Sequence, residues 1–195
     1  MTIKQSFRRL PVTLSLITLS CLVSVITWFG ELHTPLSWLY YNHELIISGQ
    51  IWRLITPIFL HFPAVGIIFA HLAFNMIWLY QFGELIERYD SPRFLLLLVI
   101  VSGVISNTAQ AQLTNGLFGG MSGVVYALLG YLFVIQKLNP AYPGRIPNNL
   151  AYFLIGFMLL AALGVFGQGI ANTAHIVGFL VGIAFAVIKG RRRGF

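Results

Sequence analysis

Three polar side chains stand out in an otherwise apolar sequence because together they could carry out acyl transfer. Ser122 is bracketed by glycines in the string Gly119-Gly120-Met121-Ser122-Gly123, at the head of an apolar segment. His71 and His175 each lie in another apolar segment. Ionisable side chains are costly inside a bilayer and usually mark function there. A serine and histidines at membrane depth indicate a nucleophile and a base, and therefore a protease that works inside the membrane.

The composition predicts a single membrane domain. The chain has 195 residues, of which 57% are hydrophobic and only 9% charged, whereas soluble domains carry about 25% charged residues. No stretch is polar enough to form a second domain. The net charge of +7 comes from 12 basic and 5 acidic residues. The basic residues lie in short loops and tails, as topology signals do, so we expect the lipid bilayer and no nucleic acid as a partner.

Six apolar segments have about the length that a bilayer requires. They cover roughly residues 12–29, 67–85, 94–113, 121–136, 150–166 and 171–188. We therefore expect an all-α membrane protein with six transmembrane helices. A short cytoplasmic N-terminus (1–11) would precede the six-helix domain (12–188), and a basic cytoplasmic tail (189–195) would follow it.

The distribution of basic residues predicts the orientation of these segments. With six spans both termini lie on one side, and 11 of the 12 basic residues fall there, Arg53 being the exception. The positive-inside rule then makes both termini cytoplasmic. The first external loop (30–66) is long and rich in aromatic residues, which predicts a position in the membrane interface. An ordinary aromatic belt and a substrate-facing role both fit this loop.

The polar residues of the apolar segments fall at one predicted depth. Ser122 and His175 lie 15 and 14 residues before the next cytoplasmic basic residue, and Asn75 and His71 lie 13 and 17 before theirs. At 1.5 Å per residue these are heights of roughly 20–26 Å above the cytoplasmic end. A shared site below the external surface explains the agreement.

Ser122 is well placed for nucleophilic chemistry if a helix begins there. The first N–H groups of a helix lack intrahelical partners, so those of Met121 and Ser122 could stabilise an oxyanion. Gly120 would let the backbone approach a substrate, and Gly123 would let a neighbouring helix approach closely. The alternative is an ordinary serine N-cap with packing glycines.

His175 shares its helix face with Gly178 and Gly182, at i+3 and i+7. Small residues there predict tight packing on the helix that starts at Ser122, within reach of its hydroxyl. Tyr126, one turn below Ser122, would buttress the imidazole. A structural interhelical hydrogen bond for His175 and plain packing for Tyr126 remain alternatives.

His71 and Asn75 are four residues apart, so they share a helix face and could both donate hydrogen bonds to an oxyanion. A polar pair that joins helices is the alternative. A metal site is not expected, because the sequence has no H-E-x-x-H and no acidic residue at this depth. The same lack of an acid excludes a full triad and favours a Ser-His dyad. The five acidic residues are Glu31, Glu44, Glu84, Glu87 and Asp90.

Together these motifs resemble the rhomboid family of intramembrane serine proteases, and in particular its bacterial members, over residues 12–188. The resemblance rests on Trp52-Arg53, His71-Leu-Ala-Phe-Asn75, the stretch 83–87, Gly119–Gly123 with Tyr126, and Ala174-His175 with Gly178 and Gly182. It implies that Ser122 is the nucleophile, that His175 is the base, and that His71, Asn75 and the Ser122 N–H form the oxyanion hole.

The resemblance also implies the substrate class and the location. Rhomboid proteases cleave transmembrane helices of other proteins near their ends without a cofactor. The fifth span and the loop 165–172, which contains Gly167 and Gly169, resemble the family's gate and cap. We expect a bacterial inner membrane.

Two departures from the bacterial relatives are expected. The stretch 61–71 is longer, and only about eleven residues precede the first span, so the extra cytosolic domain of some relatives is absent. Two other function classes are alternatives: a non-enzymatic rhomboid-like factor that holds transmembrane helices, which would lack the serine or histidine, and a transporter, which would need paired discontinuous helices.

Overall fold

The computed structural model describes residues 9–63, 68–114, 116–166 and 169–192, and within them the protein is all helical. Each of the six predicted segments coincides with one long helix. These helices are α2 (Pro11–Ile26), α5 (Ala70–Tyr89), α6 (Pro92–Leu113), α7 (Ser122–Leu138), α8 (Asn148–Ala162) and α9 (Asn172–Arg192). The expectations for Gly167, for residues 64–67 of the stretch 61–71, for the first eight residues and for the last three fall outside the described residues.

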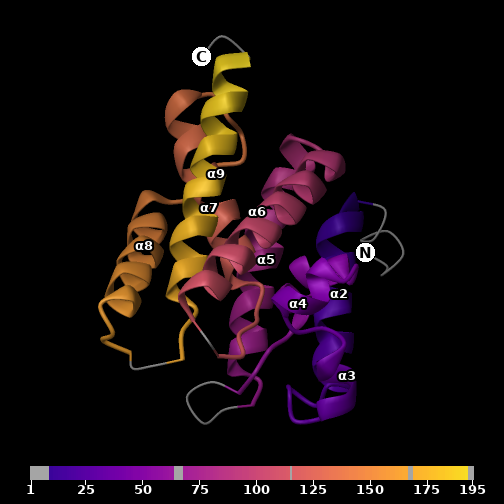
Figure 1. The fold of residues 1–195 in the computed structure, drawn as a ribbon. Coiled ribbons are helices and arrows are strands. Elements are labelled where there is room, and N and C mark those ends of the chain that lie inside the picture. Colours follow the sequence, from indigo (N-terminus) through magenta and orange to yellow (C-terminus); the bar gives the residue numbers. More distant parts are fainter. Residues whose placement is uncertain (1–8, 64–67, 115, 167–168, 193–195) are drawn as a thin grey trace.

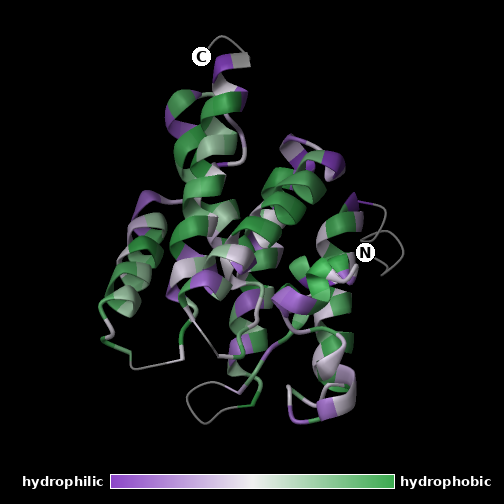
Figure 2. Ribbon diagram, in the orientation of Figure 1, coloured by the Kyte–Doolittle hydropathy of each residue, from purple (hydrophilic) through white to green (hydrophobic). Residues whose placement is uncertain are grey.

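Two of these helices meet the length and hydropathy of a membrane span by themselves. They are α6 and α9, over Pro92–Leu113 and Asn172–Arg191. Helices α2, α7 and α8 are apolar but shorter, at 16, 17 and 15 residues. Figure 2 shows hydrophobic ribbon along most of α6, α8 and α9. The all-helical class is therefore confirmed, while the count of six spans remains a prediction.

Helix α7 is the centre of the bundle. It packs most extensively on α9, and α6 and α5 cover its other sides (Figure 1). Twelve of its 17 residues are buried. Glycines allow the α7–α9 contact, because a Cβ at Gly178 would overlap the carbonyl oxygen of Gly123, and one at Gly182 would overlap that of Ala127. This is the close packing that the spacing of the two glycines predicts.

The segment between α2 and α5 folds into short elements rather than an open loop. They are α3 (His33–Ser37), α4 (His43–Ile47) and two 3₁₀ turns, η1 (Ile51–Leu54) and η2 (Thr56–Phe59). Arg53 is buried here and donates to the carbonyl oxygen of Tyr40 at 2.9 Å. Asn107 of α6 donates to the carbonyl oxygen of Leu54 at 2.9 Å. The first bond joins two parts of the segment, and the second attaches the segment to α6.

Two buried carboxylates, those of Glu87 and Asp90, join the end of α5 to other helices. Glu87 of α5 accepts from the backbone N–H groups of Val12 and Thr13 at 2.7 and 2.8 Å, so it caps the start of α2 from another helix. Asp90 accepts from the hydroxyls of Tyr131 and Tyr142 at 2.8 and 2.6 Å. It also pairs with Lys189, which ties the far end of α9 to the end of α5.

Candidate active site

Ser122 is the first residue of α7 and half-buried. Met121 occupies the N-cap position with φ −73° and ψ −4°, and no side chain caps this helix end. The serine N-cap alternative is therefore wrong, because the Ser122 side chain makes no capping hydrogen bond to the first turn of α7. Its hydroxyl is directed instead to the neighbouring helix, and its N–H belongs to the unsatisfied first turn.

His175, in the first turn of α9, meets Ser122 directly. Its Nε2 lies 2.7 Å from the Oγ of Ser122, and the histidine is only 7% exposed. A hydroxyl at this distance can pass its proton to an unprotonated imidazole nitrogen. The Nδ1 of His175 has no hydrogen-bond partner among the described residues. The pair has the geometry of a dyad, without a carboxylate to orient the base.

Packing orients the imidazole in place of a carboxylate. The ring of Tyr126 lies 4.9 Å from that of His175, centroid to centroid, at 38°. The backbone next to the histidine is fixed from α6, where Gln110 Oε1 accepts from the Ala174 N–H at 3.0 Å. Gln110 was not predicted from the sequence. The only signal in the sequence was a glutamine within an apolar segment, because a polar group that becomes buried there requires a hydrogen-bond partner.

Glycines let three elements converge on Ser122. Gly120 has φ +118°, and a Cβ there would lie 2.6 Å from the Nε2 of His71. A Cβ on Gly123 would lie 2.8 Å from the Oγ of Ser106 and 3.2 Å from the carbonyl oxygen of Ala174. His71 therefore lies directly over the backbone that leads to Ser122.

His71 and Asn75 lie together on α5, as their spacing predicts. The Nδ2 of Asn75 donates to the carbonyl oxygen of His71 at 2.9 Å, and its Oδ1 is buried without a partner among the described residues. The Nδ1 of His71 lies 3.2 Å from the carbonyl oxygen of Phe62. A carbonyl only accepts, so this nitrogen carries the proton. The Nε2 of a neutral His71 is then an acceptor, and it donates only when the ring is protonated.

The backbone before Ser122 is held by the segment that precedes α5. The Gly120 N–H donates to the carbonyl oxygen of Pro57 at 3.0 Å, and the Met121 N–H donates to Nε2 of His61 at 3.4 Å. The expectation that the Met121 N–H serves an oxyanion is therefore wrong, because a buried acceptor already engages it. His61 was not predicted as a site residue, although it is a lone histidine at the end of an apolar stretch.

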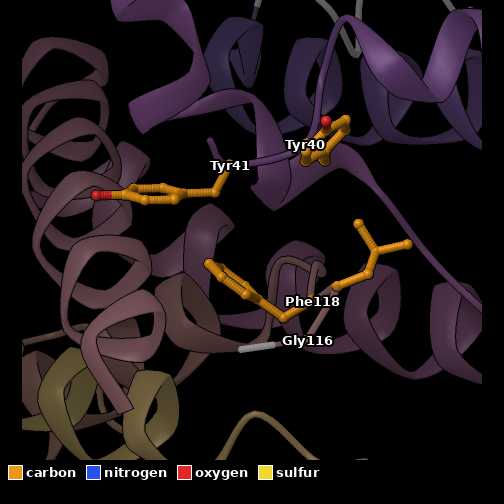
Figure 3. A pocket seen from close by; sticks show the side chains of 5 residues that line it. Tyr40, Tyr41, Gly116 and Phe118 are labelled. Atoms are coloured by element: carbon orange, nitrogen blue, oxygen red, sulfur yellow. The ribbon is translucent and has the colours of Figure 1, made fainter. Parts of the chain in front are cut away.

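A small cavity lies beside the same backbone (Figure 3). It has a volume of about 160 Å³, and its lining does not include Ser122 or His175. Figure 3 shows Tyr41 opposite Phe118, and their ring centroids are 6.0 Å apart. The cavity therefore lies beside the chain that leads to α7 and not at the dyad. Its lining residues are Tyr40, Tyr41, Gly116, Leu117 and Phe118.

Histidines and acids do not gather into a metal site in the described part of the chain, where no three of them cluster. The expectation that the protein needs no metal or cofactor stays a prediction.

The family model of the rhomboid domain matches residues 48–192. A rhomboid protease GlpG of Yersinia pseudotuberculosis (serotype I) is 32% identical over 176 residues, which cover 90% of this chain and 62% of that protein. The rhomboid protease GlpG of Salmonella paratyphi A is 31% identical over 180 residues, covering 91% of this chain and 63% of that protein. The chain thus spans less than two thirds of the length of these relatives.

Proposed function

The chain belongs to the rhomboid family, and from that premise we propose that it is a serine endopeptidase that cleaves transmembrane helices of other membrane proteins. The observation that carries the proposal is the 2.7 Å contact between Nε2 of His175 and Oγ of Ser122. The names of the relatives, which are proteases, support the same activity.

In the proposed mechanism, Oγ of Ser122 attacks the scissile carbonyl carbon while its proton passes to Nε2 of His175. The C–N bond then breaks, and the departing amine takes that proton. A water molecule repeats the steps on the acyl-enzyme. It gives a proton to His175 as it attacks, and Ser122 recovers the proton when the ester bond breaks.

The oxyanion would be stabilised by donors at the start of α7 and on α5. The Ser122 N–H is one of the unsatisfied groups of the helix start. One hydrogen of the Asn75 amide is bound to the carbonyl of His71, which leaves the second for the substrate. The contact with the Phe62 carbonyl keeps one proton on Nδ1 of His71. His71 therefore offers a donor at Nε2 only when the ring takes up a second proton.

Substrate entry is proposed between α5 and α8. Helix α8 contacts the rest of the bundle less than the other long helices do. Phe157 of α8 lies 6.3 Å from Phe74 of α5, centroid to centroid, and stacks at 4.6 Å on Phe166. The contact between Phe74 and Phe157 would separate when α8 moves outward, which supports the expected role of the fifth span as a gate.

The proposed setting is a bacterial membrane crossed by all six long helices, with both termini in the cytoplasm and the segment 30–66 in the external interface. Single cysteines placed at Ser48 and Arg145, in a Cys21→Ser background, test this topology. A membrane-impermeant thiol reagent should label them from opposite sides, and labelling from one side would contradict the arrangement.

The activity is tested with purified protein, a model transmembrane substrate and a fluorophosphonate probe. We expect cleavage and labelling by the wild type and neither by Ser122→Ala or His175→Ala. Ser102→Ala is the matched control, because its buried hydroxyl donates only within α6, to Leu98 and Val99. Full activity of Ser122→Ala would contradict the proposal. A folded wild type that neither cleaves nor labels would favour the non-enzymatic binding factor.

A further inference from the structure

His61 is a buried histidine outside the dyad and the expected oxyanion donors. It follows η2 and is 1% exposed. Its ring stands edge-on to that of His71, with centroids 5.1 Å apart, and His71 in turn lies over Gly120. The environment also includes the hydroxyl of Ser24 on α2. His61 therefore sits where α2, α5 and the start of α7 meet.

The hydrogen bonds of His61 agree on a single tautomer. Its Nδ1 lies 3.1 Å from the carbonyl oxygen of Phe59, which can only accept, so Nδ1 carries the proton. The Ser24 hydroxyl donates to the carbonyl of Ser20, so its oxygen at 3.4 Å is a second acceptor for this proton. The Nε2 receives the Met121 N–H at 3.4 Å and therefore offers a lone pair.

The backbone that His61 holds is the part of the chain that aims Ser122. Two successive N–H groups are fixed there, that of Gly120 on Pro57 and that of Met121 on His61. Gly120 has φ +118°, and a glycine has more backbone conformations open to it than other residues have. The peptide groups on either side of it therefore need hydrogen bonds from other segments to keep one orientation. The next peptide unit carries the Ser122 N–H.

We propose that His61 is a positioning residue of the protease: its neutral Nε2 accepts the Met121 N–H and thereby fixes the direction of the Ser122 N–H and Oγ. The proposal rests on the proposed function. A protonated Nε2 would face the Met121 N–H with a second donor, and the hydrogen bond between them would be lost. His61 does not touch the substrate, so its effect would appear in the chemical step and not in substrate binding.

The test compares two substitutions at position 61. In His61→Gln the side-chain oxygen reaches about as far as Nε2 and still accepts, whereas His61→Phe keeps a ring but offers no acceptor. We expect His61→Phe to lower kcat and the rate of fluorophosphonate labelling about 10- to 100-fold with KM within about 2-fold, because misplaced donors weaken transition-state stabilisation. His61→Gln should recover at least half of that loss on a logarithmic scale. The exposed His43→Phe serves as the control and should match the wild type.

Several outcomes would overturn the proposal. They are a wild-type kcat in His61→Phe, an equal loss in the two folded variants, or a loss confined to KM. An inactive wild type would contradict the proposed protease instead. The ¹⁵N spectrum of labelled histidines in the folded wild type tests the proposal even if His61→Phe does not fold. The signal that disappears in His61→Gln should belong to a ring protonated at Nδ1 alone, and protonation at Nε2 would overturn the assignment.

Discussion

The carbonyl oxygen of Gly123 on α7 occupies the place where any side chain at Gly178 on α9 would begin. The two helices are therefore in contact through backbone atoms, at the residue after Ser122 on α7 and three residues after His175 on α9. Ser122, the proposed nucleophile, begins α7, and His175, the proposed base, lies in the first turn of α9. Their 2.7 Å separation thus follows from helix packing and does not depend on a flexible connection.

Gly178→Ala is expected to lower the free energy of unfolding by about 2 kcal/mol, because the added methyl group must push α9 away from α7. Cleavage should fall as well, since His175 moves with the helix. Gly156→Ala on α8 is the matched control, with no atom within 4 Å of the new methyl group. It should be neutral or up to about 1 kcal/mol stabilising. Thermal unfolding in detergent micelles distinguishes the two, and equal midpoints would contradict the packing argument.

Gly120→Ala should damage activity more than stability. The new Cβ would lie 2.6 Å from Nε2 of His71, in a backbone conformation with φ +118°. Gly49→Ala has nearly the same strain, with φ +109°, but meets no atom within 4 Å. Both should lose about 1 kcal/mol of unfolding free energy. Only Gly120→Ala should lose at least about 10-fold in kcat, because it alone displaces His71, a proposed oxyanion donor. Similar kcat values for both would show that His71 is not the cause.

Asp90→Asn is expected to cost about 3 kcal/mol of unfolding free energy, because it removes the negative charge from a buried pair. The Asp90 side chain is fully buried and the Lys189 side chain is 14% exposed. Lys189→Met alone leaves the carboxylate buried beside two tyrosine hydroxyls. The double variant removes both charges, so it should be more stable than the sum of the single effects. Additive losses in this double-mutant cycle would mean that the pair does not stabilise the fold.

The stability of the protein should fall in mild acid because of His61. Burial, and then the charge of His71, lower the pKa of His61 from 6.5 to about 3. Below pH 6.5 the unfolded chain therefore binds a proton that the folded chain does not. The unfolding free energy should decrease from pH 6.5 toward pH 3, by up to about 1.4 kcal/mol per pH unit. Above pH 7 the His61 side chain should not affect the unfolding free energy through protonation. His61→Gln should lessen the slope, and an unchanged slope would contradict the assignment.

The long helices and the relation between Ser122 and His175 could be predicted from the sequence, because both depend on local patterns. Apolar runs define helices, and glycines at i+3 and i+7 from a histidine define a contact face. The roles of His61, Gln110 and Pro57 could not be predicted in this way. Each acts across a large separation in the chain on a backbone group near the dyad, and His61 and Pro57 do so from a segment without regular periodicity. Sequence spacing carries no information on such contacts.

The expected oxyanion donors show the same limit. The spacing of His71 and Asn75 correctly put them on one helix face, but it could not show that Phe62 fixes the proton on Nδ1 of His71. Likewise the helix start at Ser122 suggested two backbone donors, and the fold engages that of Met121 elsewhere. Whether a group is free to donate depends on its other hydrogen-bond partners, which come from distant parts of the chain.

The glycines around Ser122 separate what a motif says about architecture from what it says about chemistry. Gly119, Gly120 and Gly123 are confined by Leu60, His71 and Ser106, and none of these restrictions involves the hydroxyl of Ser122. A homologous chain that had lost its serine would still need the glycines to pack this way. A pseudoenzyme of this fold would therefore retain the glycine signature intact. Genome searches that score the whole string would misassign it, whereas the serine and histidine alone would report on catalysis.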